Sequence, residues 1–293
     1  MATEPPLVVI VGPTASGKTS LAIRLAKQFG GEIISADSRA VYRGLDIGTA
    51  KPSTEERLEV PHWGIDIVDP DQRFTAADFK QYASEMIDAI RARGKVPFLV
   101  GGTGLYINSV LYDYQFPPEP DDANRSDELT RLDLDELYKY CVKNNITLPR
   151  NNKNKRHVVN NILRNGVTLK RKDENLPNSI VVGIATDKLT LRSRIEQRAD
   201  AMFTSKVIEE AKSVVGNYGW EREAMTGNIY PLIHEYLDGN ISIQEAQQKF
   251  IVLDWQLAKR QNTWFRRDEH IKWLDADSAY TYIAQVLEGY SNS

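Results

Sequence analysis

The sequence predicts an α/β protein in which a parallel β-sheet is flanked by helices and a smaller α-helical domain is inserted. Two observations support this prediction. Short apolar strands alternate with helical segments, with glycine at most of the joints, which is the pattern of a doubly wound parallel sheet. In mid-chain that alternation stops and the charge pattern changes. The length of 293 residues is enough for both parts.

The first half of the chain supplies three expected strands and two expected helices. The strands are short runs of apolar residues, and the first is bounded by Pro6 and Gly12, as a buried parallel strand is. The helices place apolar residues at i, i+3 and i+4 and end at glycine. In order, the expected elements are strand Leu7–Val11, helix Lys18–Phe29, strand Glu32–Ser35, helix Ala76–Arg93 and strand Val96–Val100.

The middle of the chain is expected to leave the sheet. Residues 116–122 (FPPEPDD) are rich in proline and acid, residues 121–136 carry seven acids against two arginines, and residues 150–172 carry eight Lys/Arg and no acid. We therefore expect a core at 1–112 and 179–293 and a helical insertion at 113–178. The core resumes with a strand at Ile180–Ile184. Helical segments Leu191–Val215, Ile243–Phe265 and Ala279–Leu287 and an edge strand Ile271–Leu274 are expected to follow.

The bulk composition excludes several classes of protein. The net charge of −3 means that nucleic-acid binding must rest on local basic clusters. The single cysteine, Cys141, excludes an intrachain disulfide and a cysteine-rich zinc site. The N-terminus has a short apolar run without a basic segment before it, and no apolar stretch approaches 18 residues. We therefore expect a cytoplasmic protein with no membrane association. A monomer is expected by default, because a function with one active site needs no second copy.

The strongest motif is GPTASGKT, which runs from Gly12 to Thr19. It fits the pattern G-x-x-x-x-G-K-[ST] between a strand and a helix, so it predicts a P-loop and a P-loop NTPase-like core. The glycines let backbone N–H groups surround an anion at a helix N-terminus. Lys18 would neutralise the outer phosphates, and the Thr19 hydroxyl would hold Mg²⁺. The loop predicts a polyphosphate site but does not choose the reaction.

Two further strand ends are expected at the same crevice. Asp37 follows the second strand, and the run VGGTGLY (100–106) follows the third and carries Thr103. A carboxylate there can hold Mg²⁺ through water or accept a proton from a nucleophile. The alternatives are that Asp37 caps a helix and that 100–106 is a simple turn from strand to helix.

Two basic clusters mix cations with Asn, Gln and aromatic residues. They are RNNKNKRHVVNNILRNG (150–166) and LAKRQNTWFRR (257–267). Such mixtures suit contact with a phosphate backbone and stacking on unpaired bases. A solvated helix face is the alternative interpretation.

These blocks together resemble the tRNA dimethylallyltransferases, the isopentenyltransferase or IPP transferase family. The resemblance rests on GPTASGKT (12–19), SADSRAVYRGLDIGTAKP (35–52), DF (78–79), VGGTGLY (100–106), IEQRADAM (195–202) and LAKRQNTWFR (257–266). The run from Asp37 to Pro52 is the most specific, because ordinary P-loop kinases have nothing like it.

The resemblance implies transfer of a dimethylallyl group from dimethylallyl diphosphate to N6 of the adenosine just 3′ of the anticodon in tRNA. Asp37 matches the general base and Thr103 the threonine that steadies the bridging oxygen of the diphosphate. Mg²⁺ is the implied cofactor, and the inserted region corresponds to a tRNA-binding domain. The diphosphate-binding residues are expected to be Gly12, Thr14, Ala15, Ser16, Gly17, Lys18, Thr19 and Arg198, with Thr19 on the metal. The tRNA-binding residues are expected to be Ser38, Arg39, Ala40, Arg125, Lys155, Arg156, Lys259, Arg260, Gln261, Trp264 and Arg266.

The sequence departs from the family pattern in its RNA-facing or supporting parts. The insertion is shorter than usual, Asn160 and Asn161 replace an Arg-Ala pair, and the usual IGYKE segment reads NIYPL at Asn228–Leu232. These differences bear on affinity for tRNA more than on the chemistry.

Three other functions fit parts of the sequence. The same donor with free AMP, ADP or ATP as acceptor would make the protein an adenylate isopentenyltransferase, which needs no extended basic surface. A small-molecule P-loop kinase would use ATP and leave the Asp37–Pro52 block unexplained. A non-catalytic RNA-binding protein would have no need for the set Lys18, Thr19, Asp37 and Thr103.

Overall fold

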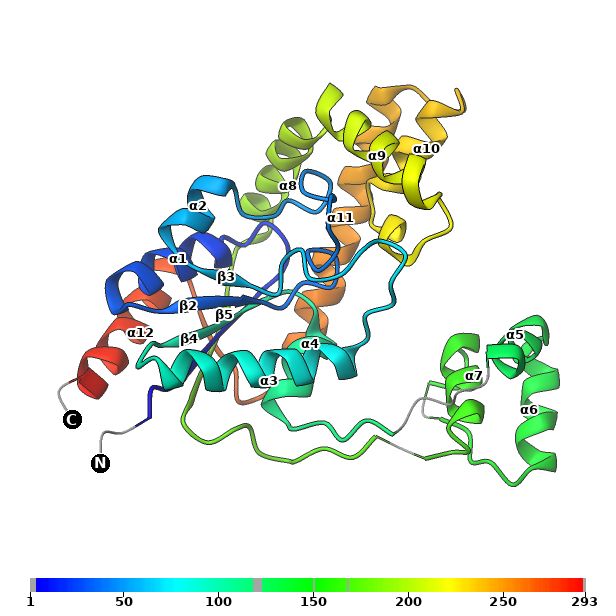
Figure 1. The fold of residues 1–293 in the computed structure, drawn as a ribbon, viewed down its shortest axis with the longest axis horizontal. Helices are drawn as coiled ribbons and strands as arrows, with labels where there is room; N and C mark the ends of the chain where they lie inside the picture. Colours follow the sequence, from blue (N-terminus) through cyan, green and yellow to red (C-terminus); the bar gives the residue numbers. More distant parts are fainter. Residues whose placement is uncertain (1–3, 118–122, 150, 168, 292–293) are drawn as a thin grey trace. The chain divides into compact units, whose positions relative to one another are not determined.

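The computed structural model describes residues 4–117, 123–149, 151–167 and 169–291. It divides the chain into two units (Figure 1): residues 4–111 with 175–291, and residues 112–174. The expected insertion at 113–178 therefore differs from the smaller unit by one residue at its start and four at its end. The acidic segment 118–122 lies outside the described residues.

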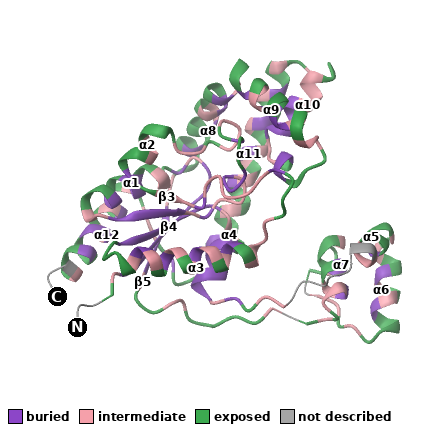
Figure 2. Cartoon of the chain, in the orientation of Figure 1, coloured by how far each residue is buried: buried purple, intermediate pink, exposed green. Residues whose placement is uncertain are grey.

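The larger unit contains a six-stranded, all-parallel sheet in the order β3-β2-β4-β1-β5-β6. The expected fold class is confirmed. The strands are β1 (Leu7–Val11), β2 (Glu32–Ser35), β3 (His62–Trp63), β4 (Pro97–Gly101), β5 (Ser179–Ile184) and β6 (Lys272–Leu274). The central strands β1 and β4 are buried on both faces, because helices cover both sides (Figure 2).

Helices pack on the two faces of this sheet. On one face, α1 (Lys18–Phe29) and α12 (Ala276–Ser291) pack on alternate side chains of β1, β4 and β5, including Val8, Ile10 and Phe98. On the other face lie α3 (Ala76–Ala92) and α4 (Gly104–Leu111) (Figure 1). The remaining helices of this unit are α2 (Thr54–Glu59), α8 (Lys188–Met202), α9 (Ser205–Tyr218), the short 3₁₀ helix η1 (Glu223–Thr226), α10 (Tyr230–Leu237) and α11 (Ile243–Phe265).

The structure departs from the expected elements in a few places. The segment Leu191–Val215 is not one helix but two, because the chain turns at Phe203 and Thr204 takes an extended conformation before α9. The elements α2, β3 and α10 are short and were not expected from the sequence pattern. Within the described residues, none of the helices has the length and apolar character required to cross a membrane.

The smaller unit is a three-helix cluster with its own core. It consists of α5 (Ala123–Arg131), α6 (Leu134–Lys143) and α7 (Lys155–Leu163). A capping box at Asp133 and Glu136 begins α6. The buried core residues are Leu129, Leu137, Cys141, Val158, Val159 and Ile162, and a backbone bridge joins Gln115 to Lys170. Burial raises the pKa of the Cys141 thiol, as expected for a residue that serves packing.

Candidate active site

The carboxyl ends of β1, β2 and β4 lead into the residues that line one pocket of about 470 Å³. Its lining includes Lys18 from the P-loop, Asp37 after β2 and Thr103 after β4. Every residue lining it belongs to the larger unit. Ligands of open parallel sheets bind at the carboxyl ends of the strands, at the point where the order of the strands changes direction.

The P-loop has the backbone that an anion site requires. Gly17 precedes α1 with φ 89°, and Ala15 also lies in the left-handed region with φ 60°, where a side chain carries a steric cost of about 1–2 kcal/mol. Gly12 leaves room for Ser16, because a Cβ on Gly12 would lie 2.8 Å from Ser16 Oγ. That buried hydroxyl has no hydrogen-bond partner among the described residues, so it is available to a ligand.

Lys18 lies in this pocket with its charge incompletely balanced. Among the residues that the structure describes, its Nζ donates one hydrogen bond, to the carbonyl oxygen of Pro13 at 3.2 Å. The pKa of Lys18 is lowered to about 8: desolvation by burial is the largest cause, Arg198 lowers it as well, and the carboxylates of Asp37 and Asp254 oppose this by raising it. A bound anion would complete the balance, because it would favour the charged form of the lysine.

Helix α8 directs two arginines at the P-loop, four residues apart on one helix face. Arg198 Nη1 donates to Thr14 Oγ1, and Arg194 Nη1 donates to the carbonyl oxygen of Ser16 at 3.2 Å. Arg198 was expected at this site and also lines the pocket. Arg194 was missed, although its i, i+4 spacing from Arg198 was a usable signal.

The ends of β2 and β4 are joined by side-chain and backbone hydrogen bonds. The backbone N–H of Ser38 donates to Thr103 Oγ1 at 3.0 Å, and the backbone N–H of Thr103 donates to the carbonyl oxygen of Ala36 at 3.2 Å. Within the segment after β2, the backbone N–H of Arg39 donates to Asp37 Oδ1 at 2.8 Å. Gly101 permits the close approach, since a Cβ there would lie 2.1 Å from the carbonyl oxygen of Ala36. Asp37 and Thr103 are therefore held side by side above the sheet edge.

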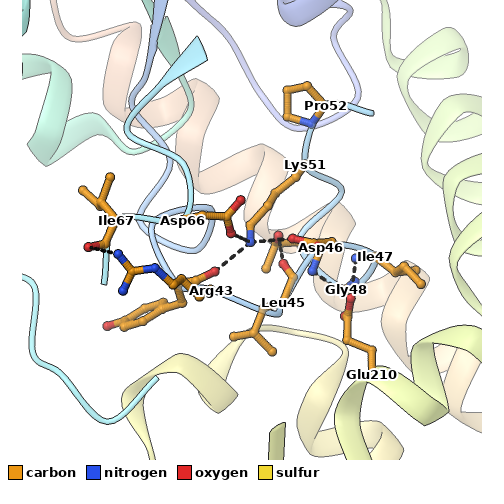
Figure 3. A network of polar contacts seen from close by, with 12 residues as sticks. Arg43, Leu45, Asp46, Ile47, Gly48, Lys51, Pro52, Asp66, Ile67 and Glu210 are labelled. Atoms are coloured by element: carbon orange, nitrogen blue, oxygen red, sulfur yellow. Dashed lines mark hydrogen bonds and ion pairs between the residues drawn. The ribbon is translucent and has the colours of Figure 1, made fainter. Parts of the chain in front are cut away.

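A polar network fixes the loop that follows Asp37 (Figure 3). The Lys51 side chain is 1% exposed, and its Nζ donates to Tyr42 O at 2.7 Å, Asp46 Oδ1 at 2.7 Å and Asp66 Oδ1 at 2.5 Å. Its three donors thus meet three acceptors. Arg57 binds the second oxygen of Asp66 at 2.8 Å.

Glu210 of α9 holds the same loop from the other side (Figure 3). Its carboxylate accepts the backbone N–H groups of Asp46, Ile47 and Gly48 at 2.7–2.9 Å. It also accepts the hydroxyl of Tyr230, the residue that the NIYPL segment shares with the family pattern, at 2.8 Å. Burial and the Glu210 carboxylate raise the pKa of that phenol. The block from Asp37 to Pro52 therefore forms a wall of the pocket that polar contacts hold from two sides.

The residues expected to bind tRNA fall into two groups. Ser38, Arg39, Ala40, Arg260 and Gln261 line the pocket. Lys259, Trp264 and Arg266 lie on or just after the same helix, α11, with Lys259 over the ring of Trp255 and Arg266 over that of Trp273.

Two of these residues also have packing roles. The Oε1 of Gln261 accepts the backbone N–H of Thr14 at 2.7 Å and so supports the P-loop. Trp264 covers Gly104, where a Cβ would lie 2.3 Å from the indole ring, and remains 41% exposed. Contact with RNA remains a prediction for both.

The other group lies in the smaller unit. Arg125 on α5 donates to the hydroxyl of Tyr140 at 3.1 Å, and Lys155 and Arg156 begin α7. Arg150, the first residue of the expected basic cluster, lies outside the described residues. Asn161, where the family pattern differs, donates to the carbonyl oxygen of Thr147 at 2.8 Å and thereby ties α7 to the preceding segment.

The parallel sheet, the P-loop motif and the pocket at the carboxyl ends of the strands define an α/β protein of the P-loop class. The chain matches the IPP transferase family over residues 40–268 and the isopentenyl transferase family over residues 5–62. The chain belongs to the IPP transferase family, and the resemblance seen in its sequence is confirmed.

Individual relatives agree with that assignment. The chain is 42% identical to the tRNA dimethylallyltransferase of Desulforudis audaxviator, over 94% of each chain. It is 36% identical to that of Bacillus subtilis, over 98% of this chain and 99% of the relative. The crystal structure of the tRNA isopentenylpyrophosphate transferase from Bacillus halodurans superposes with a TM-score of 0.75 at 35% identity and covers 99% of both chains.

Proposed function

We propose that this enzyme transfers the dimethylallyl group of dimethylallyl diphosphate to N6 of the adenosine 3′-adjacent to the anticodon in tRNA. Membership of the IPP transferase family supports prenyl transfer to tRNA. The single observation that carries the chemistry is that Lys18, Asp37 and Thr103 line one pocket. A cation suited to the diphosphate and a carboxylate suited to accept a proton therefore face the same pocket, which supports the proposed reaction.

Asp37 is the proposed general base. One of its oxygens is already held by the backbone N–H of Arg39, and within the described residues the other takes no hydrogen bond. That oxygen accepts the proton of the N6 amino group as its nitrogen forms a bond to C1 of the prenyl group. The C1–O bond breaks, and its electron pair leaves with the diphosphate.

The leaving diphosphate gains negative charge, and the P-loop supplies the stabilisation. Lys18 and Arg198 contribute positive charge, and the unpaired hydroxyl of Ser16 contributes a donor. Thr103 is the proposed partner of the bridging oxygen. Donors fixed before the reaction stabilise such charge without reorganisation, which is usually the largest catalytic contribution.

The residues present fit a Mg²⁺ ion that is bound with the substrate. The Thr19 hydroxyl is a hard oxygen donor that lines the pocket. Within the described residues no cluster of three acidic, His or Cys side chains forms a metal site on its own. Mg²⁺ commonly uses one or two protein ligands and completes its shell with substrate phosphates and water. Bound in this way, it would neutralise charge on the diphosphate.

Binding of tRNA is proposed to use both groups of residues described above. The target base must leave the anticodon stack, which costs a few kcal/mol. Contacts from α11 and from the unit at 112–174 would offset that cost. Action as a monomer is proposed because the reaction needs only one active site. A tRNA substrate also favours a cytoplasmic location.

The test is an assay with labelled dimethylallyl diphosphate and Mg²⁺, offering either an unmodified anticodon stem-loop or free AMP. Label is expected in the stem-loop and not in AMP. Transfer to AMP alone would assign the protein to adenylate prenylation, and transfer to neither acceptor would contradict the proposal.

A further inference from the structure

One acidic residue in the pocket has no part in the reaction described above. Asp254 of α11 is 3% exposed and lines the pocket together with Lys18 and Arg198. Its Oδ1 accepts the side-chain amide of Asn228 at 2.8 Å. Its Oδ2 is buried and, within the described residues, accepts no hydrogen bond. The nearest cation to that oxygen is Arg198, with Nη1 at 3.8 Å.

A carboxylate in this position is costly and works against the ligand. Burying an ionised group without full hydrogen bonding destabilises the fold unless opposite charge is close by. Lys18 and Arg198 supply that charge, and the charge of Asp254 acts on Lys18 across the pocket. When a diphosphate binds, however, the same carboxylate repels it at close range and in a partly desolvated site, where screening is weak.

The contacts of Asp254 do not suit an ordinary support for Arg198. A supporting carboxylate would make short, bidentate hydrogen bonds to the guanidinium. Here Arg198 Nη1 donates instead to Thr14 Oγ1, and the distance of 3.8 Å to Asp254 Oδ2 is that of an ion pair without a hydrogen bond. Asp254 therefore acts mainly through its charge.

We propose that Asp254 is an internal countercharge that competes with the diphosphate for Lys18 and Arg198, and so limits how tightly the site holds pyrophosphate after the prenyl group has been transferred. This inference rests on the proposed function, in which pyrophosphate is the product that must leave. Binding energy that holds substrate and product equally does not accelerate the reaction. A fixed negative charge lowers the affinity of the site for the diphosphate substrate and for the pyrophosphate product, and thereby favours release of pyrophosphate.

The experiment compares pyrophosphate binding to the full chain and to Asp254→Asn by calorimetry, with and without Mg²⁺. Asparagine keeps the shape and can still accept the amide of Asn228 while it removes the charge. Two controls accompany it. Asp200→Asn removes one negative charge from the exposed face of α8, where Asp200 contacts Gln247 at 2.6 Å. Asn228→Ala removes the hydrogen bond to Asp254 but keeps its charge.

Asp254→Asn is expected to bind pyrophosphate roughly 10-fold more tightly, which corresponds to about 1.4 kcal/mol. Neither control should tighten binding. In turnover with a stem-loop acceptor, the donor KM should fall and pyrophosphate should inhibit at lower concentration, while kcat should not rise.

Three results would overturn the inference. Unchanged affinity in Asp254→Asn would make the residue a packing element, and weaker affinity would make it a support for Arg198. Loss of the Mg²⁺ dependence of binding in that variant alone would make it a metal ligand. The proposed function is tested by a different result, which is transfer of label by the unaltered chain. It can therefore fail while the inference about pyrophosphate affinity holds, and the reverse is also true.

Discussion

Two lysines that line the same pocket are balanced in different ways. Lys51 donates to a carbonyl and two carboxylates, so its three N–H donors are all satisfied within the protein. Lys18 has one carbonyl partner, and desolvation lowers its pKa to about 8. A satisfied buried charge stabilises a loop, whereas an incompletely balanced one creates affinity for a ligand. The contrast separates the wall of the pocket from the part that is proposed to bind the diphosphate.

The largest expected effect comes from the carboxylate beside Lys18. Asp37→Asn keeps the size of the side chain but removes the proton acceptor. Prenyl transfer to an anticodon stem-loop should fall by roughly 10²–10⁴-fold, as for loss of a general base, with thermal stability little changed. Asp69→Asn is the matched control, because Asp69 forms a largely exposed ion pair with Arg43. Full activity in Asp37→Asn would remove Asp37 from the mechanism.

Lys18→Met tests the incompletely balanced cation directly. It should lower kcat/KM for dimethylallyl diphosphate by about 10²–10³-fold, the size of effect seen when one donor to developing charge is lost. The free energy of unfolding should stay the same or rise, because a desolvated charge with incomplete pairing is removed. Kinetic assays and denaturant unfolding of the same variant would show whether activity falls while stability is kept. A clear loss of stability would contradict the contrast with Lys51.

Lys51→Met should show the opposite pattern. Removing the ammonium leaves the neighbouring carboxylates of Asp46 and Asp66 without the cation that they share. We therefore expect a loss of about 2–4 kcal/mol in the free energy of unfolding. The estimate is below that for a fully buried pair because the Asp46 side chain is 60% exposed. Lys27→Met, which breaks an exposed pair with Glu59, should cost less than about 1 kcal/mol. Equal losses in the two variants would show that the Lys51 network is not a special support.

The pH dependence sharpens the comparison further. The pKa of Lys18 lies below its ordinary value of 10.5, at about 8 in the folded protein without ligand. Above pH 8 the free enzyme loses the ammonium, so kcat/KM for the donor should fall about 10-fold per pH unit. Between pH 8 and 10.5 the unfolded chain binds more protons at this lysine, so its contribution to stability should rise with pH. A Lys18→Arg variant with residual activity should keep its charge and lose the alkaline decline.

The smallest effect is expected far along the chain from both lysines. Replacing Lys155 and Arg156 by Ala should weaken stem-loop binding several-fold and reduce the slope of log affinity against log salt by about 1–2. Filter binding at several salt concentrations measures both quantities. If the slope of log affinity against log salt is unchanged, Lys155 and Arg156 do not contact RNA phosphates and α7 presents only a solvated surface.

The sequence by itself determined the fold class, the P-loop and the strand-end positions of Asp37 and Thr103. These features follow from local patterns: buried β-branched runs, helical spacing and glycines at joints, all of which act over a few residues. The lengths of β1, α1, β2 and α11 agree with those patterns to the residue. The break between α8 and α9 does not, because the apolar spacing continues through the turn at Phe203.

Only the tertiary structure decided which distant side chains line the pocket or support the loops around it. The local sequence indicates only that Asp254 is a polar residue on an amphipathic helix and that Arg194 is one of many cations. Their roles arise because α8 and α11 pack together and against the P-loop, a consequence of long-range burial that no short pattern encodes. The same holds for Glu210, whose four hydrogen-bond donors come from chain segments more than 160 residues before it and 20 after it.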